Sequence, residues 1–243
     1  MEKKQSIVNI KETQLKLYEK LKPSGWGDKL KTFILGEEFT RILTALLRES
    51  SDGKHFTPKL KQVFRAFEEC PYKELKIVIV GQDPYPWVID QVTVADGIAF
   101  SCSNTGKDQP SLKYMFKEIE DTCYPGGYSW DPDLKRWSNQ GILLLNTALT
   151  TSVGKVGTHY LLWQPFIAFL FDIITFANPG LIYVFLGTKA KTWSVSVPDN
   201  NFKLFTTHPA SAAYDNAENW DSGDLFNKIS ELSLQHYGQK ITW

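Results

Sequence analysis

Residues 76–87 read KIVIVGQDPYPW, a short apolar run that ends in a glycine, a glutamine and Asp83. A run of this length without polar interruption predicts a β-strand that is covered on both faces, as in a parallel sheet. The prolines at positions 84 and 86 have fixed φ angles, so the turn after the strand is stiff. The sequence thus holds one carboxylate in a rigid turn at the end of a buried strand.

Further apolar runs repeat this pattern and alternate with longer amphipathic segments. The strand-like runs cover 141–146, 181–187 and 202–208, and the helix-like segments cover 28–50 with a break near Gly36, 111–122, 163–177 and 224–237. Helical crossovers between buried strands predict an α/β fold with a central, mostly parallel four-stranded sheet flanked by helices. No linker or repeat divides the chain, so we expect one domain over residues 25–243, preceded by a loosely attached N-terminal arm over residues 1–24.

The composition restricts the classes of partner and compartment. Lysine plus arginine (27) balance aspartate plus glutamate (27), so any DNA-binding face must be local. The three cysteines are widely spaced and form neither a disulfide framework nor a zinc motif. The first residues lack the apolar core of a signal peptide, and no run of about 18 uncharged apolar residues indicates a membrane span. We therefore expect a soluble protein in the cytoplasm, or in the nucleus if the source is eukaryotic or viral.

Functional residue types follow each of the four predicted strands. In chain order these residues are Asp83, Asn146, Gly187, Thr188, His208 and Pro209. Ligands of open α/β sheets bind at the carboxyl ends of the strands, so this set is predicted to line one pocket. Each member alone is ordinary, because Asp-Pro is a common turn, asparagine a common cap, and a lone histidine is usually structural. The set as a whole indicates a site.

Six short motifs follow one another along the chain. They are GQDPY (81–85), GIAFS (97–101), QPSL (109–112), LLLN (143–146), LGT (186–188) and HPAS (208–211). In this order they resemble the family-1 uracil-DNA glycosylases, and GQDPY is the most specific of them. The resemblance implies a base-flipping enzyme that hydrolyses the bond between uracil and deoxyribose in DNA, without a metal or cofactor.

The resemblance implies catalytic roles for Asp83 and His208. Cleavage of an N-glycosidic bond spreads positive charge over the sugar and negative charge over the departing base. A site for this reaction therefore needs a carboxylate near the sugar and a hydrogen-bond donor near the base. By similarity Asp83 stabilises the sugar cation and positions the attacking water, while His208 donates a hydrogen bond to uracil O2. A neutral imidazole is sufficient for that bond.

Four further residues are implied to bind uracil: Gln82, Tyr85, Phe100 and Asn146. The side-chain amide of Asn146 matches the O4 and N3–H groups of uracil, so cytosine would leave a buried group unpaired. Tyr85 is placed against C5 of uracil, where it excludes the methyl group of thymine. Phe100 stacks on the base, although core packing is the ordinary role of a phenylalanine, and Gln82 fixes a uracil carbonyl.

The same resemblance implies small, Gly- and Pro-containing loops that contact DNA. Their residues are Pro110, Ser111, Gly187, Thr188, Pro209, Ser211 and Ala212. Backbone N–H groups in such loops approach phosphates closely, which reconciles a neutral chain with a DNA substrate. Lys113, Lys189 and Lys191 are candidates for added positive charge, though surface lysines are usually only solvated. The expected partners are uracil-containing DNA, single- or double-stranded, and a protein inhibitor, and the chain itself is expected to be a monomer.

Three features depart from the family pattern. Pro86 stands where most members have histidine, and the 86–96 segment is longer than the usual loop. Ala212 falls where most members carry a leucine that enters the base stack. Because a methyl group cannot fill the space of an extruded base, we expect either a preference for single-stranded DNA or another wedge, such as Tyr214 or an aromatic residue of the 86–96 segment.

Two other functions compete with this one. A non-enzymatic DNA-binding or polymerase-accessory module on the same fold has no need of Asp83, Asn146 and His208 together. Another α/β hydrolase or a nucleotide-binding protein would carry G-x-S-x-G, a Walker loop or G-x-G-x-x-G, and the sequence has none of these. An enzyme that removes uracil from DNA is therefore the favoured hypothesis.

Overall fold

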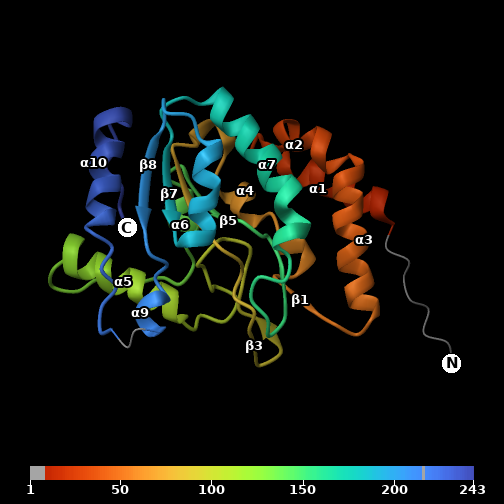
Figure 1. Ribbon diagram of the computed structural model, residues 1–243, viewed down its shortest axis with the longest axis horizontal. Helices are drawn as coiled ribbons and strands as arrows, with labels where there is room; N and C mark the ends of the chain where they lie inside the picture. Colours follow the sequence, from red (N-terminus) through yellow and green to blue (C-terminus); the bar gives the residue numbers. More distant parts are fainter. Residues whose placement is uncertain (1–8, 215–216) are drawn as a thin grey trace.

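The computed structural model describes residues 9–214 and 217–243, and a parallel four-stranded sheet forms its centre (Figure 1). The strands are β2 (Ile77–Gly81), β5 (Ile142–Asn146), β7 (Ile182–Leu186) and β8 (Phe202–Thr206), in the spatial order β5-β2-β7-β8. All residues of β2 and β7 are buried, which explains why both runs are continuously apolar. The α/β fold with a four-stranded parallel sheet that the sequence predicts is confirmed.

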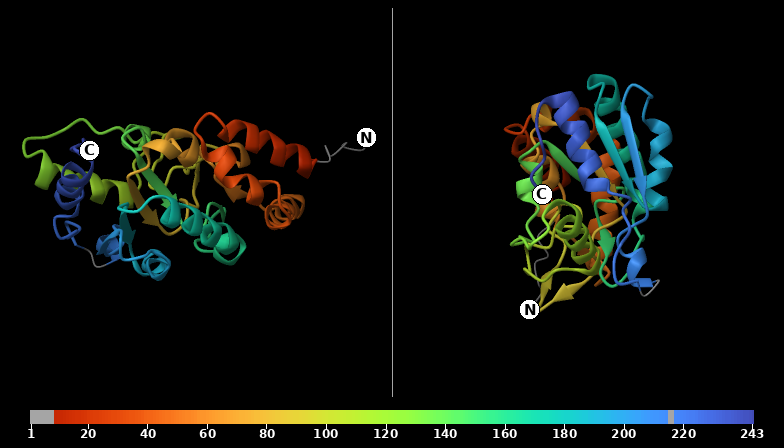
Figure 2. Two further views of the ribbon diagram at one scale, coloured as in Figure 1. Left: turned by 90° about the horizontal axis from the view of Figure 1, so that it is seen from above. Right: turned by 90° about the vertical axis from the view of Figure 1, so that its left-hand side faces the viewer.

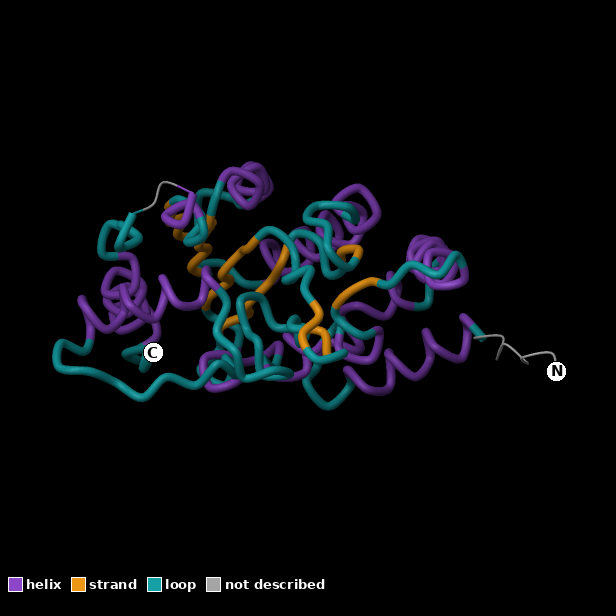
Figure 3. The backbone as a smooth tube through the Cα atoms, turned by 90° about the horizontal axis from the view of Figure 1, so that it is seen from below, coloured by secondary structure: helices purple, strands orange, loops and turns teal. Residues whose placement is uncertain are grey.

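The register of the sheet brings the ends of the strands to one edge. Gly81 pairs with Asn146, and Leu186 pairs with Thr206. All neighbouring strands in this sheet are parallel, so the loops that follow them leave from the same side of the molecule. Seen from below, loops and turns occupy much of this side (Figure 3).

Helices surround the sheet. They are α1 (Ile10–Leu21), α2 (Trp26–Ile34), α3 (Glu37–Ser51), α4 (Arg65–Glu69), α5 (Pro110–Cys123), α6 (Lys135–Ser138), α7 (Tyr160–Ala177), α8 (Thr188–Lys191), α9 (Ser211–Tyr214) and α10 (Leu225–Tyr237), with 3-10 turns at Leu60–Gln62, Tyr72–Glu74 and Thr192–Ser196. Helices α1 and α10 lie at opposite ends of the molecule (Figures 1 and 2). The expected break near Gly36 separates α2 from α3. A Cβ on Gly36 would stand 2.7 Å from the carbonyl oxygen of Thr32, so glycine permits this close turn.

Helix α1 differs from the loose N-terminal arm expected from the sequence. The side chain of Gln14 is buried and donates hydrogen bonds to the carbonyl oxygens of Ile34 at 2.8 Å and Gly36 at 3.1 Å. Leu21 is also fully buried. Residues 1–8 lie outside the described residues, but the helix itself packs as part of the fold, because its amide satisfies backbone carbonyls at the α2–α3 junction.

Two small antiparallel sheets have no clear signal in the sequence. Strand β1 (Phe56–Thr57) pairs with β6 (Thr151–Ser152), and β3 (Val88–Ile89) pairs with β4 (Val92–Thr93). The second pair is a hairpin with Asp90 and Gln91 in its turn, both at positive φ, and it accounts for the length of the 86–96 segment. Strands of two residues are too short to show an alternating pattern.

Helix α7 is, among the described helices, the one long and apolar enough to cross a membrane by length and composition. One face of this helix packs into the core through the buried side chains of Trp163, Phe166 and Leu170. The Phe166 ring contacts Phe33 and Phe64, with centroids 5.2 and 5.4 Å apart. The hydropathy of α7 therefore reflects its packing against neighbouring helices.

Candidate active site

An open groove of about 950 Å³ lies at the carboxyl edge of the sheet. Most of the predicted site residues line it, namely Gln82, Asp83, Tyr85, Phe100, Pro110, Ser111, Asn146, Gly187, Thr188, His208 and Ser211. The ends of all four strands contribute to its walls, as the parallel register requires.

The Asp83 carboxylate is held by a segment that lies far away in the sequence. Its Oδ2 accepts a hydrogen bond from the backbone N–H of Gly157 at 2.5 Å, and its Oδ1 accepts one from the Tyr160 hydroxyl at 3.3 Å. Burial raises the pKa of Asp83 above its usual value, and the two hydrogen bonds oppose that rise because they favour the ionised form. The carboxylate is thus partly buried and fixed in orientation.

His208 lines the same groove from the loop after β8. Its Nδ1 accepts a hydrogen bond from the backbone N–H of Ala210 at 3.2 Å. Burial lowers the pKa of His208 to about 4, so the imidazole is neutral at pH 7. In a neutral ring whose Nδ1 is an acceptor, the proton is on Nε2, and Nε2–H is therefore a hydrogen-bond donor.

Gly187 allows the loop after β7 to lie close to two of these side chains. Its φ is +90°, a conformation that favours glycine. A Cβ at this position would stand 2.8 Å from Nε2 of Gln82 and 2.9 Å from Cβ of His208. A larger residue would therefore push Gln82 and His208 apart, which explains the glycine in the LGT motif.

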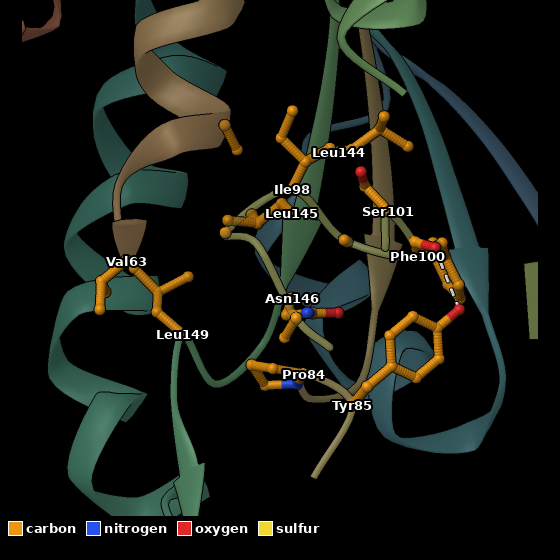
Figure 4. Close-up of a pocket in the computed structure, with 14 residues that line it drawn as sticks. Val63, Pro84, Tyr85, Ile98, Phe100, Ser101, Leu144, Leu145, Asn146 and Leu149 are labelled. Atoms are coloured by element: carbon orange, nitrogen blue, oxygen red, sulfur yellow. Dashed lines mark hydrogen bonds between the residues drawn. The ribbon is translucent and has the colours of Figure 1, made fainter. Parts of the chain in front are cut away.

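Tyr85, Phe100 and Asn146 lie together beside the end of β2 (Figure 4). The Tyr85 hydroxyl donates a hydrogen bond to the carbonyl oxygen of Phe100 at 3.0 Å, which fixes the tyrosine ring. Phe100 has a left-handed φ of +67°. A Cβ on Gly81 would stand 3.0 Å from the Phe100 ring and 2.6 Å from Oδ1 of Asn146, so glycine makes room for both. The Asn146 amide makes no hydrogen bond to the other residues drawn in Figure 4.

Two of the predicted DNA-binding residues do not line the groove. Pro209 is buried, and Ala212 is 5% exposed and packs in the hydrophobic core. The short helix α9 turns the next residue, Ala213, to the groove instead. The expected place of the leucine wedge thus holds a methyl group that points inward. The side chain of Tyr214 lies outside the described part of the structure.

The groove also has apolar walls, and the sequence indicated one of them, the aromatic residue of the 86–96 segment. Trp87, Val156 and Phe205 line it and are 52%, 71% and 46% exposed. Lys191 lines it as well, and its Nζ lies 5.5 Å from the centre of the Phe205 ring, so one of the expected lysines adds positive charge there. Trp87, two residues after the GQDPY motif, is the aromatic residue of the 86–96 segment. The exposure of Val156 and Phe205 depends on the fold.

The groove offers charge and hydrogen bonds rather than metal ligands. The described residues contain no group of three or more histidine, cysteine, aspartate or glutamate side chains that could hold a metal. The cysteines, Cys70, Cys102 and Cys123, are free thiols. An arrangement of this kind can stabilise a cation beside Asp83 and a developing anion beside His208.

Comparison with known proteins agrees with this chemistry. Residues 67–231 match the model of the uracil DNA glycosylase superfamily. The uracil-DNA glycosylase of Borreliella burgdorferi is 33% identical over 199 residues, covering 79% of this chain and 85% of that protein. The uracil-DNA glycosylase of Campylobacter lari is 32% identical over 222 residues, covering 90% of this chain and 93% of that protein.

Solved structures show the same fold. The mimivirus uracil-DNA glycosylase superposes with a TM-score of 0.81 at 24% identity, over 96% of this chain and 88% of that one. A variant of the mimivirus protein in complex with UGI gives a TM-score of 0.80 at 25% identity, over 90% and 89% of the two chains. The family resemblance seen in the motifs is thereby confirmed, and the chain belongs to the uracil-DNA glycosylase superfamily, a family of enzymes.

Proposed function

We propose that this enzyme hydrolyses the N-glycosidic bond of deoxyuridine in DNA, releases free uracil and leaves an abasic site without cutting the strand, as a step of base excision repair. The observation that carries the proposal is the presence, in one groove, of a partly buried carboxylate, a neutral imidazole and a side-chain amide. The reaction needs the carboxylate near the sugar, the imidazole near uracil O2 and the amide at the Watson–Crick edge of the base.

Asp83 acts on the sugar side of the bond. As the bond lengthens, positive charge builds on the deoxyribose, and an ionised carboxylate stabilises that charge. The donors of Gly157 and Tyr160 limit the movement of the carboxylate, so it can also orient the attacking water and accept a proton from it. Because burial raises the pKa of Asp83, its carboxylate is protonated at a higher pH than an exposed aspartate, and we expect the rate to fall as the pH falls through that pKa.

His208 acts on the base side. Its Nε2–H donates to uracil O2 while negative charge grows on the departing base. With a pKa of about 4 the ring stays neutral through the physiological range, and the donor is always present. The Phe100 ring, whose centroid lies 5.8 Å from that of His208, offers an apolar surface on which the flipped base stacks.

Asn146 and Tyr85 select uracil from the other pyrimidines. The Asn146 amide donates to O4 and accepts from N3–H, and cytosine presents the opposite pattern. The Tyr85 ring, held by its bond to the Phe100 carbonyl, forms a wall against C5 and excludes the thymine methyl group. Gln82, which lines the groove next to Asp83, binds a uracil carbonyl.

The loops around the groove bind the DNA backbone. Helix α5 begins at Pro110, and Ser111 in its first turn lines the groove, where free N–H groups and the helix dipole favour a phosphate. Thr188 and Ser211 line other parts of the wall. Contacts of this kind need no basic stripe, in keeping with a chain of zero formal net charge.

UGI is a candidate protein partner. It was solved with the mimivirus relative, and we extend that association to this chain. Size-exclusion chromatography of the purified protein with and without UGI tests it, and the expected result is a one-to-one complex. The run without UGI also tests the expected monomer.

A uracil-containing single-stranded oligonucleotide in EDTA tests the proposed reaction. We expect free uracil and strands that break only after alkali treatment. Strands that break without alkali would contradict the monofunctional reaction. An unchanged oligonucleotide at high enzyme concentration would favour a non-enzymatic DNA-binding module. The same oligonucleotide with thymine or cytosine in place of uracil is the matched control and should stay intact.

A further inference from the structure

Segment 157–160 is built around Asp83, although it lies 74 to 77 residues further along the chain. Gly157 and Tyr160 contact different oxygens of the carboxylate, at 2.5 and 3.3 Å. Pro84, the residue after Asp83, has no N–H to donate. The orientation of the carboxylate is therefore set by this distant segment more than by its own turn.

Gly157 combines a backbone conformation and a close contact that no larger residue can share. Its φ is +72°, and a Cβ there would stand 2.8 Å from Cε2 of the Tyr160 ring. The ring thus lies directly against the glycine, which brings the Gly157 N–H and the Tyr160 hydroxyl to one carboxylate. Asp83 lines the groove and Tyr160 is not among its lining residues, so the tyrosine contacts the carboxylate from behind.

A buried network anchors this segment. His159, at the N-terminus of α7, is 7% exposed; its Nε2 lies 2.9 Å from Oε2 of Glu49, and its Nδ1 lies 2.8 Å from Oγ1 of Thr150. Thr150 in turn accepts a hydrogen bond from Nε1 of Trp163 at 2.7 Å. These contacts tie the start of α7 to α3 and to the loop after β5, so the backbone of the next residue, Tyr160, is fixed.

We propose that Tyr160 is a positioning residue for Asp83: its hydroxyl fixes the orientation of the carboxylate from outside the groove, with Gly157 as its steric partner. The remaining lone pairs of the carboxylate then face the sugar and the attacking water. This inference rests on the proposed role of Asp83 in uracil release.

Few other groups act on the carboxylate. The charged and titratable groups that line the same groove or lie against the partners of Asp83 are Tyr85, His208, Lys191, Lys189, Glu49 and His159. None of them forms a hydrogen bond with Asp83 among the described residues. The nearby Thr151 hydroxyl also lowers the pKa of Asp83, although it donates its hydrogen bond to the carbonyl oxygen of Lys155 at 2.7 Å. A donor to the ionised carboxylate lowers its pKa, so loss of the Tyr160 hydroxyl must raise the pKa of Asp83.

Titration of the protein without DNA tests the contact directly. In Tyr160→Phe the pKa of Asp83, followed by the NMR shift of its carboxyl carbon, is expected to rise, and in Tyr183→Phe it should not change. Tyr183 is a matched control because its buried hydroxyl has no hydrogen-bond partner within the described residues. This readout needs no activity, so it remains informative if uracil release is absent.

The pH dependence of uracil release tests the consequence for the reaction. For Tyr160→Phe we expect the acid side of the pH–rate profile to move to higher pH. The rate should fall by about tenfold at a pH where Asp83 is largely protonated in the variant. It should fall much less at a pH where Asp83 is ionised in both proteins. Gly157→Ala should move the profile in the same direction, because the added Cβ displaces the Tyr160 ring. Thermal melting shows whether each variant folds.

The outcomes separate the two proposals. An unchanged Asp83 titration in a folded Tyr160→Phe variant overturns the positioning role. If the pKa of Asp83 shifts in Tyr160→Phe but the pH–rate profile does not change, the contact of Tyr160 with Asp83 is unimportant for the reaction. A shifted titration in a protein whose wild type releases no uracil supports the contact and overturns the proposed function instead.

Discussion

Two titratable groups of the groove, Asp83 and His208, are held in opposite ways. Asp83 receives donors from a distant segment, Gly157 and Tyr160, and these oppose the rise in its pKa that burial causes. His208 receives a local bond from Ala210, and burial alone lowers its pKa to about 4.

The difference fits the charge that each group needs in the proposed reaction. Burial disfavours the charged form of either group. A carboxylate that must be ionised therefore requires compensating donors, whereas an imidazole that must be neutral requires only burial. Desolvation thus favours the neutral form that the proposed role of His208 requires and disfavours the ionised form that the proposed role of Asp83 requires, which explains why the hydrogen-bond donors lie on the Asp83 side.

Replacement of Asp83 by asparagine should have the largest effect. The side chain keeps its size and can still accept the Gly157 bond, but it has no charge to stabilise the sugar cation. We expect single-turnover uracil release to fall by roughly 10²–10⁴-fold, while DNA affinity in fluorescence anisotropy stays close to that of wild type. Equal losses of rate and affinity would show that Asp83 binds DNA instead of acting on the transition state.

Replacement of His208 by alanine should have the next largest effect, a loss of about 10²–10³-fold in the single-turnover rate, as for other groups that stabilise a developing oxyanion. His208→Gln tests whether a neutral hydrogen-bond donor is sufficient at this position. A glutamine amide is a neutral donor, so this variant should keep more activity than His208→Ala. Equal activities of the two variants would contradict neutral hydrogen-bond donation.

His208 should also make the stability depend on pH. Its pKa falls from 6.5 to about 4 on folding, so between these values the unfolded chain binds the proton and the folded chain does not. The contribution of the neutral His208 ring to the free energy of unfolding is fully present above pH 6.5 and is lost as the pH falls from 6.5 to about 4. The difference between pH 7 and pH 4.5 should be on the order of 2 kcal/mol. Urea unfolding of wild type and His208→Gln measures it, and the variant should lack this part of the dependence.

The positions of Asp83 and His208 in one groove could be predicted from the sequence. Asp83, Asn146 and His208 end or follow short apolar runs, and parallel strands end at one edge of a sheet. The prediction that they share a groove therefore needed only the pattern of the runs and the GQDPY resemblance.

The support of Asp83 could not be predicted in the same way. Gly157 and Tyr160 reach the carboxylate because α7 is anchored to α3 through Glu49 and His159, a contact between segments 110 residues apart. No local pattern encodes such a contact. Helix α9 shows a second limit, since four residues contain too little periodicity to tell which of two adjacent alanines faces the groove.

The smallest effect concerns these two alanines beside His208, and it tests the wedge. Ala212→Leu adds bulk at a packed position and should lower the free energy of unfolding by about 1–3 kcal/mol without improving activity. Ala213→Leu adds the same atoms at an exposed position on the groove, so it should fold like wild type.

Extrusion of a base from a duplex costs a few kcal/mol, and an apolar side chain that fills the vacancy lowers that cost. Ala213→Leu should therefore increase uracil release from duplex DNA severalfold and leave release from single-stranded DNA unchanged. An equal gain on both substrates would show that position 213 does not act as a wedge. If wild type already releases uracil equally fast from single-stranded and duplex DNA, the wedge lies elsewhere on the groove. Trp87 lines the groove and is 52% exposed. In that case Trp87→Ala should slow release from duplex DNA and leave release from single-stranded DNA unchanged.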